Sequence, residues 1–184
     1  STLYHVFMDV NTTLANSSLV GQLNQIEAGL LAKQVALPKF SIQNKVYNSY
    51  NRKVIQQEKI TYEPITISFH DDSADTVLNL WRDYYSYYFR DSDYKIDNYT
   101  YNSKYQQRQV TDWGFTPRKA DNDNQTYLNS IQIYSLHQHR FSSYTLMRPV
   151  ITSFQHGTHT YGEYDPLEHQ MTVAYEGVLY SSGP

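Results

Sequence analysis

The chain has 184 residues and a mass of 21.6 kDa, which suits one domain of ordinary size. It contains no cysteine, so disulfide frameworks, thiolate metal sites and cysteine nucleophiles are excluded. Only 18% of the residues are charged and the formal net charge is -3, which argues against a dedicated nucleic-acid-binding domain with a basic face. Tyrosine is unusually frequent, with 19 copies. Because its ring is apolar and its tip polar, this surplus fits either β-strand surfaces or a protein interface, and composition does not separate the two.

The beginning of the chain predicts a strand, because STLYHVFMDV alternates between apolar and polar residues instead of forming a continuous apolar signal segment. The weakly periodic stretch 14–33 contains two glycines and is either a short helix or a loop. No apolar run approaches the roughly 20 residues that span a bilayer, so we expect no membrane insertion. No linker or internal repeat divides the chain, so we expect a single domain over residues 1–184.

Three strands are predicted next, at 40–46, 52–57 and 63–70. The segment 47–51 lacks the glycine typical of a tight turn, so a longer hairpin loop is expected between the first two. In the third, Ile65, Ile67 and Phe69 alternate with polar residues, which predicts one buried and one polar face. Pro64 stands near its start, where a missing N–H does least harm.

A helix is predicted over 74–89. Asp71-Asp72-Ser73 offers N-cap oxygens, and apolar side chains then recur at helical spacing. These side chains are Val77, Leu80, Trp81, Tyr84 and Tyr88. Such an aromatic stripe is more often core packing than a ligand-stacking surface. Beyond the helix, residues 90–129 predict a loop-rich insertion, followed by strands at 131–139, 144–154 and 171–180.

The histidines are the most promising candidates for chemistry. His137 and His139 lie two apart and would share one face of a strand, as metal ligands often do. A second group follows in a turn-like stretch and comprises His156, His159, Glu163, Asp165, Glu168 and His169. Neither group has the count and spacing of a metal site, so surface histidines are the favoured interpretation and no metal is expected.

Motifs for catalysis and nucleotide binding are absent. There is no G-x-S-x-G elbow and no glycine-rich phosphate loop, so we expect no catalytic residues and no cofactor. Lys45, Arg52 and Lys53 interleave with Tyr47 and Tyr50, which is the composition of a single-strand nucleic-acid platform. Three positive charges on a net acidic chain are few, so such a platform is not the favoured interpretation.

Several segments, taken together in their order and spacing, carry a resemblance to a known family. They are 36–38, 50–54, 64–69 running into Asp71 and the helix of Trp81, 131–134, 149–154 and 171–180. These segments resemble the tube proteins of contractile phage tails, including the tube-initiating proteins of the baseplate. The resemblance implies a mainly β fold, a tail-tube-like β-sandwich or barrel with one flanking α-helix. It also implies a structural role without enzyme activity.

The same resemblance implies an assembly. Six copies would form a ring, and rings would stack into a tube in the virion, assembled in the host cytoplasm, through which DNA passes. Strands from 40–57 and 63–70 would supply a shared barrel wall lining the lumen. A lumen without a basic surplus would pass DNA without specific binding. Partners would be other copies, adjacent tube or baseplate ring proteins, and tape-measure and sheath proteins. The insertion at 90–129 favours a baseplate tube initiator over the repeating subunit.

On this hypothesis the contacts between subunits or rings involve Leu37, Pro38, Tyr47, Tyr50 and Arg52. They stand in turns beside polar strands, where a monomer has little need of apolar side chains. Two alternatives remain open. One is an extracellular β-sandwich that binds carbohydrate or acts as a metal-dependent enzyme, with tyrosines as sugar platforms. The other is the related effector-delivery tube of bacterial secretion systems.

Overall fold

The computed structural model describes residues 3–11, 32–71, 75–88, 126–162 and 167–183, which form ten β-strands and one α-helix. In chain order the elements are β1 (Leu3–Val10), β2 (Ala32–Val35), β3 (Lys39–Ser49), β4 (Arg52–Glu63), β5 (Ile65–His70), α3 (Thr76–Tyr88), β6 (Leu128–His137), β7 (Arg140–Met147), β8 (Val150–Gln155), β9 (Glu168–Ala174) and β10 (Gly177–Gly183). The predicted insertion at 90–129 and the ambiguous stretch at 14–33 lie almost entirely outside the described residues.

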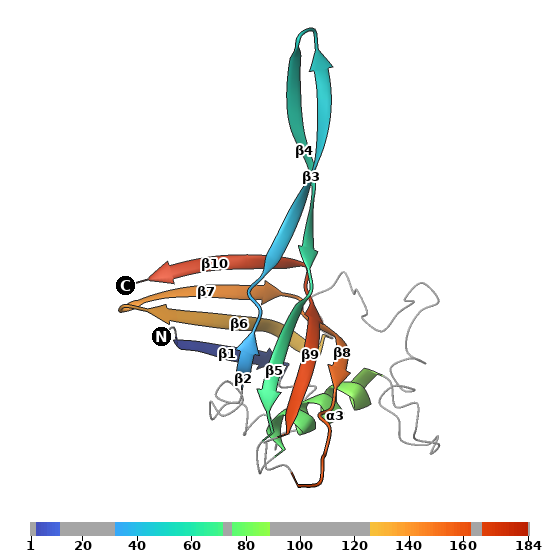
Figure 1. Cartoon of the computed structure of the whole chain (residues 1–184), viewed down its shortest axis with the longest axis vertical. Helices are drawn as coiled ribbons and strands as arrows, with labels where there is room; N and C mark the ends of the chain where they lie inside the picture. Colours follow the sequence, from blue (N-terminus) through green and yellow to red (C-terminus); the bar gives the residue numbers. More distant parts are fainter. Residues whose placement is uncertain (1–2, 12–31, 72–74, 89–125, 163–166, 184) are drawn as a thin grey trace.

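The strands form two four-stranded antiparallel sheets and a separate two-stranded ribbon. The strand orders are β1-β6-β7-β10 in the first sheet and β2-β5-β9-β8 in the second, and β3 pairs with β4 in the ribbon. In Figure 1 the strands of the first sheet run across those of the second, and the ribbon projects away from both. The predicted mainly β fold with a flanking helix is confirmed.

One apolar core joins the inner faces of the two sheets. Strand β1 buries every second residue toward it through Val6, Met8 and Val10, as the alternation of the first ten residues predicts. The predicted alternation of β5 is also confirmed, because Ile65, Ile67 and Phe69 are buried. Further core side chains come from both sheets and are Ile131, Ile133, Leu146, Ile151, Met171 and Val173.

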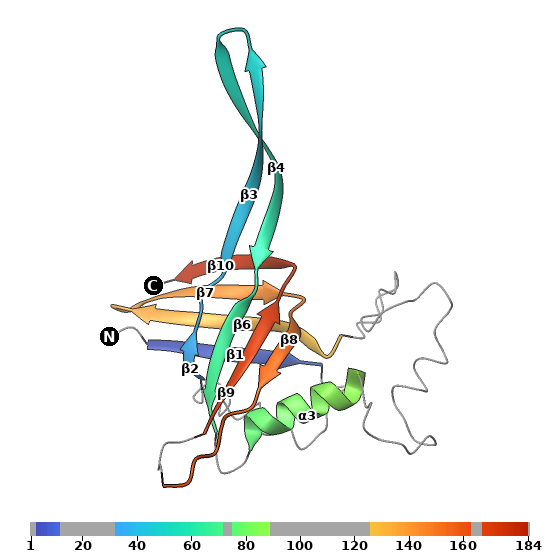
Figure 2. The same ribbon diagram turned by 45° about the vertical axis from the view of Figure 1, so that its right-hand side comes forward.

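Helix α3 packs on this core with the predicted face. Val77, Leu80 and Tyr84 are buried, and the indole of Trp81 stacks on the ring of Phe154 in β8, with ring centroids 4.9 Å apart. Figure 2 shows α3 beside β8 at the end of the second sheet farthest from the ribbon. The buried amide of Ile151 donates a hydrogen bond of 3.2 Å to the Tyr84 hydroxyl. The predicted stripe is therefore core packing from Val77 to Tyr84, while the side chain of Tyr88 lies outside the described part.

Three strand predictions in the second half of the chain are wrong at their boundaries. The predicted strand 144–154 is two strands in different sheets, because Arg148 adopts a φ of 48° and Pro149 has no N–H to donate. Likewise 171–180 divides between β9 and β10, which lie in different sheets. The predicted strand 131–139 ends at His137, since Gln138 and His139 have positive φ and turn the chain into β7.

The hairpin prediction is also corrected. Strands β3 and β4 extend further than expected, and Ser49 pairs with Arg52, so only Tyr50 and Asn51 form the turn. The lack of glycine suggested a longer loop. Instead, Tyr50 itself adopts the left-handed φ of 52° that a two-residue hairpin turn requires. Its side chain is fully exposed, which leaves room for this conformation.

Candidate functional site

The ribbon of β3 and β4 is the part of the described chain that lacks a covering layer. Every residue from Lys39 to Thr61 is exposed, and no third strand pairs with β3 or β4 among the described residues. Both views show the ribbon extending well beyond the two sheets (Figures 1 and 2). A two-stranded hairpin without a third strand or a packed helix is marginally stable at best in water. The ribbon therefore lacks the packing that stabilises the other strands.

Two prolines mark the boundary between the ribbon and the second sheet. Pro38 precedes β3 and Pro64 follows β4, so the two chain segments lose a backbone donor at about the same level. Between the two ladders, the Ala36 amide donates a hydrogen bond of 3.1 Å to the Thr66 carbonyl. The ribbon is thus a separate ladder that continues the direction of β2 and β5.

One face of the ribbon is apolar. The register pairs Phe40 with Tyr62, Ile42 with Ile60 and Val46 with Ile55. Side chains directly opposite each other on paired antiparallel strands share a face, and alternation brings these three pairs to the same one. We call this surface the apolar face; its apolar members are Phe40, Ile42, Val46, Ile55, Ile60 and Tyr62, and the polar pairs Asn44–Gln57 and Asn48–Lys53 lie on it as well. Ile55 is 67% exposed and Val46 54% exposed, which is unusual for large aliphatic side chains on one surface.

A β-bulge at Glu58 brings the apolar side chains of β4 to one face. Lys59 pairs with Gln43 and Gln57 pairs with Asn44, so Glu58 has no partner in the ladder. In a regular strand, Ile55 and Ile60 would point to opposite faces because an odd number of steps separates them. Because the unpaired residue adds one position to β4 without adding a pair, both isoleucines lie on the same face.

The opposite face of the ribbon is polar and carries most of its positive charge. We call it the polar face; its members are Ser41, Gln43, Lys45, Tyr47, Ser49, Arg52, Val54, Gln56, Lys59 and Thr61. The Lys45 ammonium lies 5.2 Å from the centroid of the Tyr47 ring, within the range of a cation–π contact. The two strands therefore form an amphipathic ribbon.

The base of the ribbon is fixed to the body by tyrosines. The Tyr62 and Tyr175 rings have centroids 5.8 Å apart, and the Tyr175 hydroxyl donates a hydrogen bond of 3.4 Å to the Lys39 carbonyl. Burial raises the pKa of the Tyr175 hydroxyl, because the ionised form is poorly solvated there. Lys39 and Glu63 form an ion pair of 3.3 Å across the first ladder position.

The five predicted contact residues are distributed along the ribbon and its base. Leu37, which is 50% exposed, and Pro38 stand at the base, and Tyr50 stands at the tip. Tyr47 and Arg52 lie on the polar face. The prediction missed the apolar face itself. Its signal is present in the alternation of Phe40, Ile42 and Val46, but the polar run from Gln56 to Lys59 and the bulge hide the matching pattern in β4.

The histidines do not assemble into a metal centre. His139 lies in the turn after β6, so it does not share a strand face with His137. In the second group, the prediction of surface histidines is wrong for His169, which is buried, with its ring in edge contact with that of His156 at a centroid distance of 5.7 Å. Glu163 and Asp165 lie outside the described residues. Within the described part of the chain, no three His, Asp or Glu side chains are placed to hold a metal ion.

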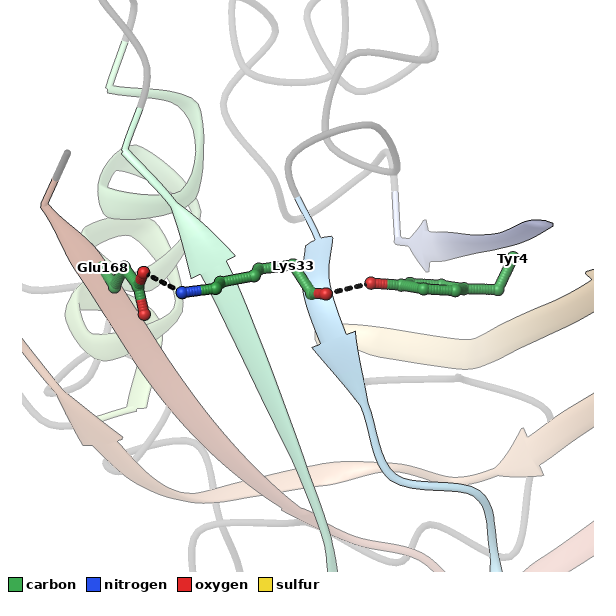
Figure 3. A network of polar contacts seen from close by, with 3 residues as sticks. All are labelled: Tyr4, Lys33 and Glu168. Carbon is green, nitrogen blue, oxygen red and sulfur yellow. Dashed lines mark hydrogen bonds and ion pairs between the residues drawn. The ribbon is translucent and has the colours of Figure 1, made fainter. Parts of the chain in front are cut away.

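A polar network links the edges of the two sheets (Figure 3). The Tyr4 hydroxyl in β1 donates to the backbone carbonyl of Lys33 in β2, and the Lys33 ammonium pairs with the Glu168 carboxylate in β9. The hydrogen bond from Lys33 lowers the pKa of Glu168. All three side chains are exposed or half-buried, so the network ties the sheets together at the surface.

Comparison with known proteins finds similarity in fold and not in sequence. No family model matches the chain, and no curated protein matches its sequence. A chain of the PVC extracellular contractile injection system, in its extended sheath–tube complex, matches with a TM-score of 0.55 and 10% identity, covering 98% of this chain and 88% of that one. A chain of the tube-terminating cap of the anti-feeding prophage matches with a TM-score of 0.52 and 8% identity, covering 98% of this chain and 88% of that one.

A chain of the anti-feeding prophage baseplate also matches, with a TM-score of 0.50, 10% identity, and coverage of 98% of this chain and 91% of that one. At such low identity the matches demonstrate a shared fold over nearly the whole length. None of the described helices is long and apolar enough to cross a bilayer. The chain therefore has a tail-tube-like fold, which it shares with chains of contractile injection system assemblies.

Proposed function

We propose that this protein is a structural subunit of a contractile tail, in which six copies form a ring of the tube. The observation that carries the proposal is the apolar face of the β3–β4 ribbon, which no described helix or strand covers beyond Tyr62. Burying a large aliphatic or aromatic side chain contributes about 1.5–3 kcal/mol relative to leaving it exposed. A second copy packed on the apolar face would bury its five exposed side chains at once, since Tyr62 is already half-buried.

A ring also accounts for the length of the ribbon. A hairpin that projects beyond its own sheets can reach the neighbouring subunit, and each copy can cover the ribbon of the next in a head-to-tail arrangement that closes. We retain Leu37, Pro38 and Tyr50 as contact residues, because they extend the surface at the base and tip. Tyr47 and Arg52 lie on the polar face, so in this arrangement they do not contact the neighbouring subunit.

The finer role that we propose is that of a tube-initiating ring at the baseplate of a phage tail, forming a conduit for DNA. The long segment at 90–129 supports a specialised ring over a plain repeating subunit. Its partners would be adjacent tube or baseplate rings, with sheath and tape-measure proteins as further contacts. The role is structural and requires no catalytic residue or cofactor.

Two adjacent residues of β4 offer a matched test. Ile55 lies on the apolar face and Val54 on the polar face, and both are exposed. Ile55→Lys should prevent ring formation, because the charge would be buried against the neighbour. Val54→Lys should leave rings intact. Light scattering and negative-stain electron microscopy of the purified variants measure this, with six subunits per ring expected for the wild type. Rings that survive Ile55→Lys would refute the arrangement.

A further inference from the structure

We propose that the polar face of the β3–β4 ribbon binds the phosphate backbone of nucleic acid through Lys59, Lys45 and Arg52. The net charge of the chain is -3, yet residues 39–63 contain five basic and two acidic side chains. The charge is therefore segregated, and the ribbon is a basic element on an acidic protein. This inference goes beyond the proposed ring, since a single subunit already presents the polar face.

The three cations are available for a ligand. Lys39 is paired with Glu63, whereas Lys45, Arg52 and Lys59 form no ion pair among the residues that the structure describes. Of the residues that pair on the polar face between Lys59 and the tip, none is acidic, and Glu58 is the unpaired residue of the bulge. The paired residues of this stretch therefore present only positive and neutral groups to an anion.

The cations form a row along the ribbon. Lys59 stands at the level of Gln43, Lys45 lies two residues further along β3, and Arg52 stands at the level of Ser49. With a rise of about 3.4 Å per residue, the row spans about 20 Å. Phosphates of one duplex strand repeat every 3.4 Å or so along the axis, so the row matches a stretch of about six phosphates.

An aromatic ring completes the row. Tyr47 occupies the level between Lys45 and Arg52 on the same face, with the Lys45 ammonium near its ring. Aromatic side chains between basic residues favour single strands, whose bases can stack on them. Of the three cations in the sequence pattern, Lys53 lies on the opposite face, and the fold puts Lys59 in its place, so that three cations share one face with Tyr47.

The test measures fluorescence anisotropy with two labelled probes, a 20-base-pair duplex and a 20-nucleotide oligo-dT, over a range of salt concentrations. For three phosphate contacts, the slope of log affinity against log salt should be about -2.7 for the duplex and about -2.1 for the single strand. Lys45→Gln with Lys59→Gln should reduce the duplex slope to about -0.9. The tighter of the two probes identifies the form of nucleic acid that is bound, and Tyr47→Leu should weaken only the single-strand probe.

Lys53→Gln is the matched control, because Lys53 is an exposed lysine of the same ribbon on the opposite face. It should leave both slopes unchanged. The proposal is overturned if Lys53→Gln acts as strongly as Lys45→Gln, if neither probe binds, or if polyglutamate of equal charge competes as well as DNA, which would indicate an acidic protein ligand. Electron microscopy of the same samples separates the two proposals. Rings without binding refute this inference alone, and binding without rings refutes only the proposed assembly.

Discussion

Ile55 and Ile60 lie on the same face of β4, although a regular strand would place them on opposite faces. The bulge at Glu58 supplies the extra residue that aligns them. The pairing of Ile60 with Ile42 and of Ile55 with Val46 then builds one apolar surface from the base of the ribbon toward its tip. The amphipathic character of the ribbon thus depends on the local count of residues as much as on their identity.

A pair of single-residue deletions tests this dependence. Deleting Glu58 should preserve assembly, because the remaining residues of β4 then match β3 one for one with the same pairs. Deleting Asn44 should abolish assembly, because Val46 and Ile55 would turn to the polar face while Ile42 and Ile60 stay. Particle size by light scattering and the circular dichroism of both variants provide the measurement. Equal loss of assembly in the two variants would contradict the role given to the bulge.

The Lys33–Glu168 pair predicts a dependence of stability on acid pH. The pKa of Glu168 is lowered by Lys33, so the stabilisation is present above the ordinary glutamate pKa and is lost as the pH falls through the lowered value. Thermal unfolding between pH 7 and pH 3 should show this loss in the wild type. Glu168→Gln should unfold at a lower temperature at pH 7 and show a flatter profile. An unchanged profile in this variant would assign the acid sensitivity to other groups.

Tyr175 predicts the opposite dependence at alkaline pH. Because burial raises its pKa, the neutral hydroxyl stabilises the fold below the ordinary tyrosine pKa, and this contribution is lost as the pH rises through the raised value. Tyr175→Phe should therefore lose less stability than the wild type between pH 9 and pH 11.5. Chemical denaturation at each pH, with Tyr161→Phe as the control at a fully exposed tyrosine, checks the difference.

Removal of the Tyr84 hydroxyl should lower the free energy of unfolding, because this hydroxyl accepts a hydrogen bond in the core. Tyr84→Phe removes the acceptor of the buried Ile151 amide, and an unsatisfied buried donor costs about 1–3 kcal/mol. Tyr144→Phe is the control, since the Tyr144 hydroxyl forms no hydrogen bond among the described residues. Urea denaturation should separate the two variants by that amount. Equal stability of both variants would show that the amide finds another partner.

Helix α3 and strand β5 could be predicted from the sequence because each buries one face against a single core. Val77, Leu80 and Tyr84 recur at the helical period, and Ile65, Ile67 and Phe69 at the strand period. The strands 144–154 and 171–180 could not be divided in the same way. Apolar alternation continues on both sides of Pro149 and of Glu176, and only the packing of the chain assigns the two sides to different sheets.

By itself, the sequence determined the mainly β class, the helix with its buried stripe and the position of the hairpin, because these depend on local periodicity. Tertiary structure alone decided which residues of β4 share a face with Phe40, Ile42 and Val46. The two-residue turn at Tyr50 sets the register of Val46 against Ile55, and the bulge at Glu58 sets that of Ile42 against Ile60. Register arises from pairing between two strands, so no pattern within either strand could reveal it.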